Sequence, residues 1–282
     1  MKISSTTLSA VVVAGGMLGL TSAIALADAA AGAQGSSPPA FPGSFTSSSS
    51  SSAPPMRVWT GTGQLGYVAS QGNSPAKSAN AVLDMSYLQD AWKHIFHFDF
   101  LYGEAANVVS AERWDTLWQS NFNFTSDFFV FGNARYGHDL FDGFEYQASA
   151  ATGIGYNVIK TDTTTLTVQA GAGYLWQRPE DITKDAAGAV TARMLLPSDN
   201  TAVATAGLTY SQKITPTTTL SDALLVNAGS GNSLITNTFQ LSVKISTKLS
   251  LALGYNIQDN TQPPPHLKSL DEFETVNLAY SL

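Results

Sequence analysis

Charged residues on alternate positions are the strongest candidates for chemistry in this sequence. They lie in stretches where apolar and polar residues alternate, on the side opposite the apolar residues. Successive side chains of a strand point to opposite faces, so we expect these charges to face the interior of a barrel. The predicted lumen charge network is Lys93, Asp99, Arg113, Asp115, Arg135 and Lys244, with Asp84 and Asp222 as candidates for addition.

The mixture of signs in this network allows two interpretations. Buried charges that pair avoid a large desolvation cost. The network could therefore be a set of salt bridges that fills the interior of a narrow barrel and closes any path through it. The same residues could line a polar conduit or a ligand site. A single-sign ring would be expected for ion selection, and the mixture therefore favours the filling.

Two further patterns contain residue types found in known sites but lack the structural context that those sites need. The glycines Gly61, Gly63 and Gly66 have dinucleotide-fingerprint spacing, but the residues after them continue a strand, where the fingerprint needs a helix. The glycines are better explained by curvature and close approach of strands. The sequence has no cysteine, and its histidines are not spaced as metal ligands: His94, His97, His138 and His266. We therefore predict no cofactor and no metal.

Serine and histidine residues leave one catalytic alternative open. A lipid hydrolase in a barrel wall would need a lipid-accessible serine beside a histidine, and such partners are neighbours in space rather than in sequence. The chain has no nucleophile-elbow motif, so we expect no enzyme. A cross-strand pair that joins Ser110 or Ser120 to His94 or His138 stays open.

Period-two alternation over about ten residues predicts the elements that position these groups. In the clearest stretch, Phe96, Phe98 and Phe100 share one face, and His97 and Asp99 share the other. Twelve such strands are predicted, at 57–69, 78–88, 92–103, 111–124, 128–138, 145–158, 164–177, 201–213, 218–227, 234–246, 248–258 and 271–282. The connections between them are predicted to alternate strictly between short and long. The fold class is therefore all-β, a transmembrane antiparallel up-and-down β-barrel of about twelve strands.

Composition agrees with a barrel in lipid. The chain carries 14 basic and 21 acidic residues, for a net charge of −7, which argues against a nucleic-acid partner. Charged residues make up only 12% of the sequence, about half the usual share in soluble domains. The five tryptophans lie mostly toward predicted strand ends, where they would form girdles at the two membrane interfaces: Trp59, Trp92, Trp114, Trp118 and Trp176.

The two ends of the chain carry signals for export and assembly. Residues 1–27 have a positive start, an apolar centre and an Ala25-Leu26-Ala27 cleavage site, and are predicted to be a cleaved signal peptide. Residues 28–55, rich in Ala, Gly, Ser and Pro, are predicted to be a disordered linker, leaving 56–282 as the barrel. The last strand presents one apolar face, which we interpret as an assembly signal: Val276, Leu278, Tyr280 and Leu282.

A series of motifs resembles a known family. The stretch W-T-G-T-G-Q-L-G-Y-V-A-S-Q-G-N-S (59–74), followed by F-V-F-G-N-A-R-Y (129–136), A-G-A-G-Y-L-W (170–176) and the final N-L-A-Y-S-L, is similar to the YdiY-like family, described as salt-induced outer membrane proteins. The resemblance covers essentially all of 57–282. It implies an outer-membrane β-barrel and supplies no catalytic residue. Leu282 departs from the phenylalanine that more often ends such barrels.

The sequence thus predicts a monomeric outer-membrane barrel with an envelope-structural or osmolarity-related role and a narrow polar lumen. A small-solute channel is the first alternative, and an outer-membrane lipid hydrolase is the second. The expected partners are outer-membrane lipid and the β-barrel assembly machinery, with no nucleic acid. With an even number of strands, both termini are expected on the periplasmic side.

Overall fold

Alternating residue types produce thirteen strands in the computed structural model. The structure describes residues 57–70, 76–106, 108–140, 143–185, 190–230, 233–261 and 269–281. The predicted signal peptide, linker and Leu282 lie outside these residues. The strands are β1 (Val58–Ser70), β2 (Ala76–Gln89), β3 (Trp92–Ala105), β4 (Val108–Asn123), β5 (Phe128–Asp139), β6 (Phe144–Lys160), β7 (Thr164–Lys184), β8 (Val190–Leu195), β9 (Asp199–Lys213), β10 (Thr218–Gly229), β11 (Ser233–Lys244), β12 (Leu249–Asn260) and β13 (Leu270–Ser281).

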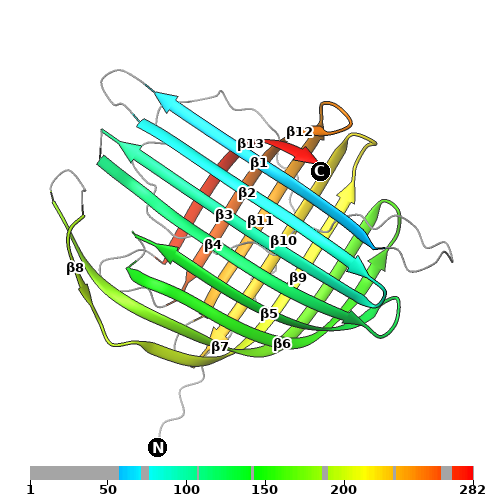
Figure 1. Cartoon of the computed structure of the whole chain (residues 1–282), viewed down its shortest axis with the longest axis horizontal. Coiled ribbons are helices and arrows are strands. Elements are labelled where there is room, and N and C mark those ends of the chain that lie inside the picture. The colour runs from blue at the N-terminus through cyan, green and yellow to red at the C-terminus, as the bar shows by residue number, and fades with distance from the viewer. Residues whose placement is uncertain are drawn as a thin grey trace, which may run out of the picture.

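Twelve of these strands close into an antiparallel barrel. Neighbours in sequence pair in order from β1 to β7 and from β9 to β13, β7 pairs with β9, and β1 pairs with β13. Figure 1 shows β1 to β5 crossing over β9 to β12 on the far side, as the tilted strands of a closed barrel must. The predicted fold class, an up-and-down β-barrel of about twelve strands, is confirmed. No helix that could span a membrane occurs among the described residues.

The thirteenth strand, β8, was not predicted. The predicted strands 164–177 and 201–213 leave residues 178–200 as a connection, but β7 continues to Lys184 and pairs with β8 as a hairpin outside the barrel sheet. Figure 1 shows this hairpin projecting beyond the barrel wall at the left. Arg193 Nη1 donates to Glu180 Oε2 at 3.0 Å within the hairpin, and its other nitrogen, Nη2, donates to the carbonyl of Leu140 at 2.6 Å. These contacts hold the hairpin against the connection between β5 and β6.

Connections at the two ends of the barrel differ less than the sequence suggested. We call the end that carries residues 90–91, 124–127, 161–163, 214–217 and 245–248 the turn end, and the opposite end the loop end. The described chain starts and finishes at the turn end. The predicted strict alternation of short and long connections is wrong, because at the loop end β3 ends at Ala105 and β4 already begins at Val108. There the strands themselves are longer than expected.

The distribution of polar and apolar side chains in the barrel is the reverse of that in a soluble protein. Polar and charged residues outnumber apolar ones among the buried side chains of the described residues. Large apolar residues are exposed on the outer face, including Trp59 at 63%, Leu65 at 70% and Val276 at 61%. All five tryptophans are exposed, as the predicted girdles require. This distribution suits a barrel whose outer wall meets hydrocarbon and whose interior is polar.

Close approach of strands explains the last glycine of the fingerprint-like motif. Asn80 Nδ2 of β2 donates to Asn277 Oδ1 of β13 at 2.9 Å, so this hydrogen bond spans the intervening strand β1. It passes over Gly66, where a Cβ atom would overlap the Asn80 side chain. The β1–β13 seam pairs backbone over only four positions, from Thr62–Ser281 to Leu65–Leu278, and the amide bridge therefore reinforces its far end.

Candidate functional site

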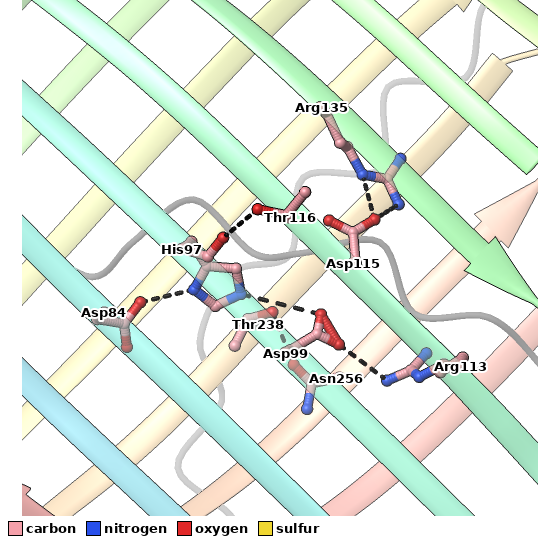
Figure 2. A network of polar contacts seen from close by, with 9 residues as sticks. All are labelled: Asp84, His97, Asp99, Arg113, Asp115, Thr116, Arg135, Thr238 and Asn256. Carbon is pink, nitrogen blue, oxygen red and sulfur yellow. Dashed lines mark hydrogen bonds and ion pairs between the residues drawn. The ribbon is translucent and has the colours of Figure 1, made fainter.

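A belt of ionisable side chains runs along one inner wall of the barrel. The charge belt consists of Asp84 (β2), His97 and Asp99 (β3), Arg113 and Asp115 (β4), and Arg135 (β5) (Figure 2). Strand alternation points all six inward, opposite apolar neighbours such as Phe98 and Trp114. The three carboxylates and the imidazole are almost fully buried, with Asp115 only 3% exposed.

The register of β2 and β3 creates the first part of the belt. Asp84 and His97 are direct cross-strand partners, and His97 Nδ1 lies 2.6 Å from Asp84 Oδ1. The other ring nitrogen, Nε2, lies 4.0 Å from Asp99 Oδ2 on the same strand. The imidazole is thus flanked by a carboxylate at each nitrogen. Figure 2 shows it between the two aspartates.

Two arginines supply the remaining positive charge. Asp99 and Asp115 are direct partners of β3 and β4, a like-charged pair that needs compensation. Arg135 provides it for Asp115: its Nε and Nη2 lie 2.7 and 2.6 Å from Asp115 Oδ2. Arg113 Nη2 lies 3.9 Å from Asp99 Oδ1. Each carboxylate therefore has a cationic or imidazole neighbour.

A glycine leaves room for the tightest ion pair. Gly137 lies opposite Asp115 in the β4–β5 register. A Cβ atom at Gly137 would stand 2.6 Å from Asp115 Oδ2 and 3.5 Å from Arg135 Nη2. Any larger residue would push the carboxylate away from the guanidinium. The absence of a side chain at this position is therefore part of the site.

Part of the belt has unfilled hydrogen-bonding capacity. Asp99 Oδ2 and Asp115 Oδ1 are buried and have no hydrogen-bond partner within the described part of the chain. Buried polar atoms of this kind are usually satisfied by water. Every ion pair of the belt joins residues of one strand or of adjacent strands. In the described part of the chain, the ion pairs of the belt therefore run along one wall of the interior.

The predicted network is only partly assembled. The structure brings together Asp99, Arg113, Asp115 and Arg135. Lys93 faces inward nearer the turn end, and Lys244 is exposed at the last residue of β11; neither forms an ion pair with a described residue. Both lysines take the inward face that the sequence predicts, but they stand apart from the belt, because inward parity alone does not set the depth of a side chain along the barrel.

The two additional aspartates have opposite outcomes. Asp84 joins the belt through His97. Asp222 does not, because it shares the outward face of β10 with Leu220 and Leu224 and accepts a hydrogen bond from Asn237 Nδ2 at 2.8 Å. His97 is the belt residue that the sequence-based network left out. Its place between Phe96 and Phe98 already marked it as inward-facing.

One serine–histidine pair left open by the sequence exists on the outer face. His94 Nδ1 lies 2.9 Å from Ser120 Oγ, across the β3–β4 pairing. His138 instead contacts the backbone carbonyl of Glu145 through Nδ1. Among the described residues, no group of three or more potential ligands is arranged for a metal ion.

Outward side chains of the terminal strand occupy the positions expected for the assembly signal. Val276, Leu278 and Tyr280 are exposed on the outer face of β13, while Asn277 and Ala279 are buried inside. Leu278 and Tyr280 also lie in the short pairing with β1 that closes the barrel. The fourth predicted residue, Leu282, lies outside the described residues.

Comparison with known proteins identifies the family. A sequence model described as "Protein of unknown function, DUF481" matches residues 63–282. The chain belongs to this family. The uncharacterized protein YdiY of Escherichia coli (strain K12) is 22% identical over 234 residues, which cover 80% of this chain and 84% of YdiY. The resemblance to a YdiY-like family is thereby confirmed.

Several solved outer-membrane barrels match the chain over most of its length, at low identity and low TM-score. The translocator domain of the autotransporter NalP from Neisseria meningitidis has a TM-score of 0.42 at 14% identity, covering 81% of this chain and 89% of that domain. The COG4313 outer membrane channel from Pseudomonas putida F1 has a TM-score of 0.44 at 11% identity, covering 81% of this chain and 96% of the channel. The NanC porin has a TM-score of 0.43 at 11% identity, covering 78% of this chain and 98% of that chain.

Proposed function

We propose that this protein is an integral barrel of the bacterial outer membrane with a narrow polar lumen and an envelope-structural, osmolarity-linked role. The observation that carries the proposal is the inverted distribution of side chains, with exposed rings and aliphatic groups outside and polar groups buried inside. In a closed barrel each strand pairs with a neighbour on both sides, which leaves no open sheet edge in hydrocarbon. Exposing so much apolar surface to water would be costly.

The narrow lumen is supported by the belt itself. Its carboxylates and imidazole are almost fully buried, which means that neighbouring side chains fill much of the space around them. Barrels of twelve strands lie between filled eight-stranded barrels and open 16-stranded porins. We therefore expect low conductance compared with a general porin.

Membrane insertion is tested by heat modifiability and by fractionation. In mild detergent, unboiled protein should migrate differently from boiled protein, because a closed barrel resists unfolding. The protein should also partition with outer membranes. Recovery only from the soluble periplasm would contradict the proposal. An osmolarity-linked role, suggested by the family resemblance, predicts that its amount in the membrane rises when cells grow in added salt.

Orientation can be tested cleanly because the sequence contains no cysteine. We propose that the loop end faces outward and the turn end faces the periplasm. Ser230→Cys lies at the loop end and Thr215→Cys at the turn end, both at exposed positions. A membrane-impermeant maleimide added to intact cells should label Ser230→Cys and spare Thr215→Cys until the cells are broken. The opposite pattern would reverse the orientation.

A small-solute conduit is the second candidate, and the course of the belt favours it. The ion pairs found among the described residues lie along one wall, and two of the carboxylate oxygens accept no hydrogen bond from a described residue. Both features suit a water-containing path with one charged side. Planar-bilayer recordings of the pure protein decide between the candidates. Small or absent conductance supports the envelope-structural role, and large, stable conductance supports the conduit.

A further inference from the structure

The outer face near the turn end carries a hydroxyl and a base in direct contact. His94 of β3 and Ser120 of β4 are cross-strand partners, and His94 Nδ1 lies 2.9 Å from Ser120 Oγ. Both side chains share the outward face with Phe96 and Trp118. The pair therefore meets the surroundings of the barrel, separated by the wall from the charge belt.

Hydrogen-bond directions prepare Ser120 to lose its proton. Trp118 Nε1 donates to Ser120 Oγ at 3.0 Å, and an indole nitrogen can only donate. The serine oxygen is the acceptor in that bond, so its own proton is free to point at His94 Nδ1. Neutral His94 accepts it in the tautomer with hydrogen on Nε2. A neighbouring base that accepts the hydroxyl proton is what activates a serine nucleophile, and the bond from Trp118 holds the hydroxyl in the orientation that points its proton at His94.

Aromatic rings hold the imidazole in place. The ring of His94 is stacked with Trp92, at 5.9 Å between centroids and 4° between planes, and with Tyr87 at 6.4 Å. The Trp118 ring lies 5.8 Å away. These neighbours restrict rotation of His94, the task that a third polar group performs in a catalytic triad. Trp92, Tyr87 and Trp118 are thus positioning residues.

The location specifies the class of substrate. Trp92 is the first residue of β3 after the turn at Asp90, and His94 is the next residue of β3 on the same face. The pair therefore lies close to the turn end. Trp92 and Trp118 are exposed, as is Trp59, which stacks on Tyr87. Exposed tryptophan and tyrosine rings sit at the headgroup level of a bilayer. At that level lie the ester bonds that join acyl chains to the glycerol of phospholipids.

We propose that Ser120 is a nucleophile, activated by His94, that cleaves acyl esters of membrane phospholipids. Ser120 Oγ attacks the ester carbonyl carbon and its proton passes to His94. The intermediate collapses as the bond between the acyl carbon and the glycerol oxygen breaks, and that oxygen takes the proton from His94. Water then attacks the acyl-serine and loses its proton to His94. The bond between the acyl carbon and Ser120 Oγ breaks, Oγ takes the proton back from His94, and a fatty acid is released. This activity is separate from the proposed role of the lumen.

The experiment uses the full-length mature barrel in detergent and in phosphatidylethanolamine vesicles. An alkyl fluorophosphonate should form a covalent adduct at Ser120, located by peptide mass spectrometry, and vesicles should release fatty acid. Ser120→Ala should abolish both. His94→Gln should slow both by about 100-fold or more, the contribution typical of a general base. Ser110→Ala, at the far end of the same strand and away from His94, should change neither.

Heat modifiability of each variant shows that the barrel is intact, so that loss of activity is not loss of fold. An unlabelled wild type in a folded barrel would overturn the proposal. So would equal labelling of Ser120→Ala, or unchanged rates in His94→Gln. Labelling without fatty-acid release would overturn the hydrolytic step.

Discussion

Two walls face each other across the interior, and they are built differently. The charged wall, formed by β2 to β5, carries the charge belt. The neutral wall, formed by β9 to β13, carries hydroxyl, amide and small side chains at its buried inward positions, including Thr205, Ser211, Thr236, Gln258 and Asn277. Ionisable inward positions of the neutral wall, such as Lys213 and Lys244, are exposed at the end of a strand.

The difference shows that charge is balanced locally. Each aspartate of the belt is compensated by a side chain on its own or an adjacent strand, over 2.6 to 4.0 Å. The neutral wall needs no such arrangement, because its contacts are single hydrogen bonds such as Thr238 Oγ1 to Asn256 Oδ1 at 2.7 Å. In the proposed lumen, a solute would therefore meet fixed charge on one side and neutral hydrogen-bonding groups on the other.

Removing one partner of the tight ion pair should have the largest effect. Arg135→Ala leaves Asp115 buried with an uncompensated charge, and breaking a buried pair in this way costs about 3–5 kcal/mol. On the neutral wall, Thr238→Ala removes one hydrogen bond and should cost about 1 kcal/mol. Reversible urea unfolding in detergent measures both free energies.

A double variant checks that charge is the cause. Asp115→Asn combined with Arg135→Gln removes both charges and should recover much of the stability lost in Arg135→Ala. Equal losses for Arg135→Ala and Thr238→Ala would mean that the two walls do not differ in the way proposed.

Two glycines offer a matched comparison of the walls. A Cβ at Gly137 on the charged wall would lie 2.6 Å from Asp115 Oδ2, and one at Gly254 on the neutral wall would lie 2.5 Å from Thr275 Oγ1. The threonine hydroxyl can rotate away, but the carboxylate is held by two bonds from Arg135. Gly137→Ala should cost about 2 kcal/mol, within the range for overpacking, and Gly254→Ala should cost less. The same unfolding measurements rank them, and a larger loss in Gly254→Ala would contradict the model.

The sequence predicted the strands better than it predicted the site. Period two located all twelve barrel strands within a few residues, because one face of each must be apolar. It missed β8, whose pairing with the extension of β7 leaves no alternating apolar face to detect. Faces were also predictable wherever the pattern was strong, as around Asp99.

Pairing within the site required information that alternation does not contain. Asp99 lies opposite Asp115 rather than opposite an arginine, which follows only from the β3–β4 register. The contact of His97 with Asp84 likewise depends on the β2–β3 register. Asp222 was misplaced because its strand has leucines on both faces, at Leu224 and Leu225, so the apolar side was ambiguous.

Ion selectivity should depend on the charged wall alone. Replacing Arg113 and Arg135 together by alanine leaves the belt carboxylates in excess, so any conductance should increase and shift toward cations. Replacing Thr238 and Gln240 by alanine on the neutral wall should widen the path with little change in selectivity. Reversal potentials in a salt gradient across a planar bilayer distinguish these outcomes. An equal shift from both double variants would show that the fixed charges do not govern passage.

The smallest expected effect reports whether the neutral wall is wet. Thr236 is buried on the inner face, and its Oγ1 has no hydrogen-bond partner among the described residues. Valine has nearly the same shape without the hydroxyl. If lumen water solvates Oγ1, Thr236→Val loses that hydrogen bond and should destabilise the barrel by about 0.5–1 kcal/mol. If the wall were dry, the hydroxyl would be a buried, unsatisfied group, and its removal would stabilise the barrel instead. We expect the loss, because Asp99 and Asp115 each have a buried oxygen without a hydrogen-bond partner among the described residues, and water in the same interior would satisfy both. The sign of the change in urea unfolding, repeated with Thr205→Val on β9, decides whether the neutral wall is hydrated at both of these strands.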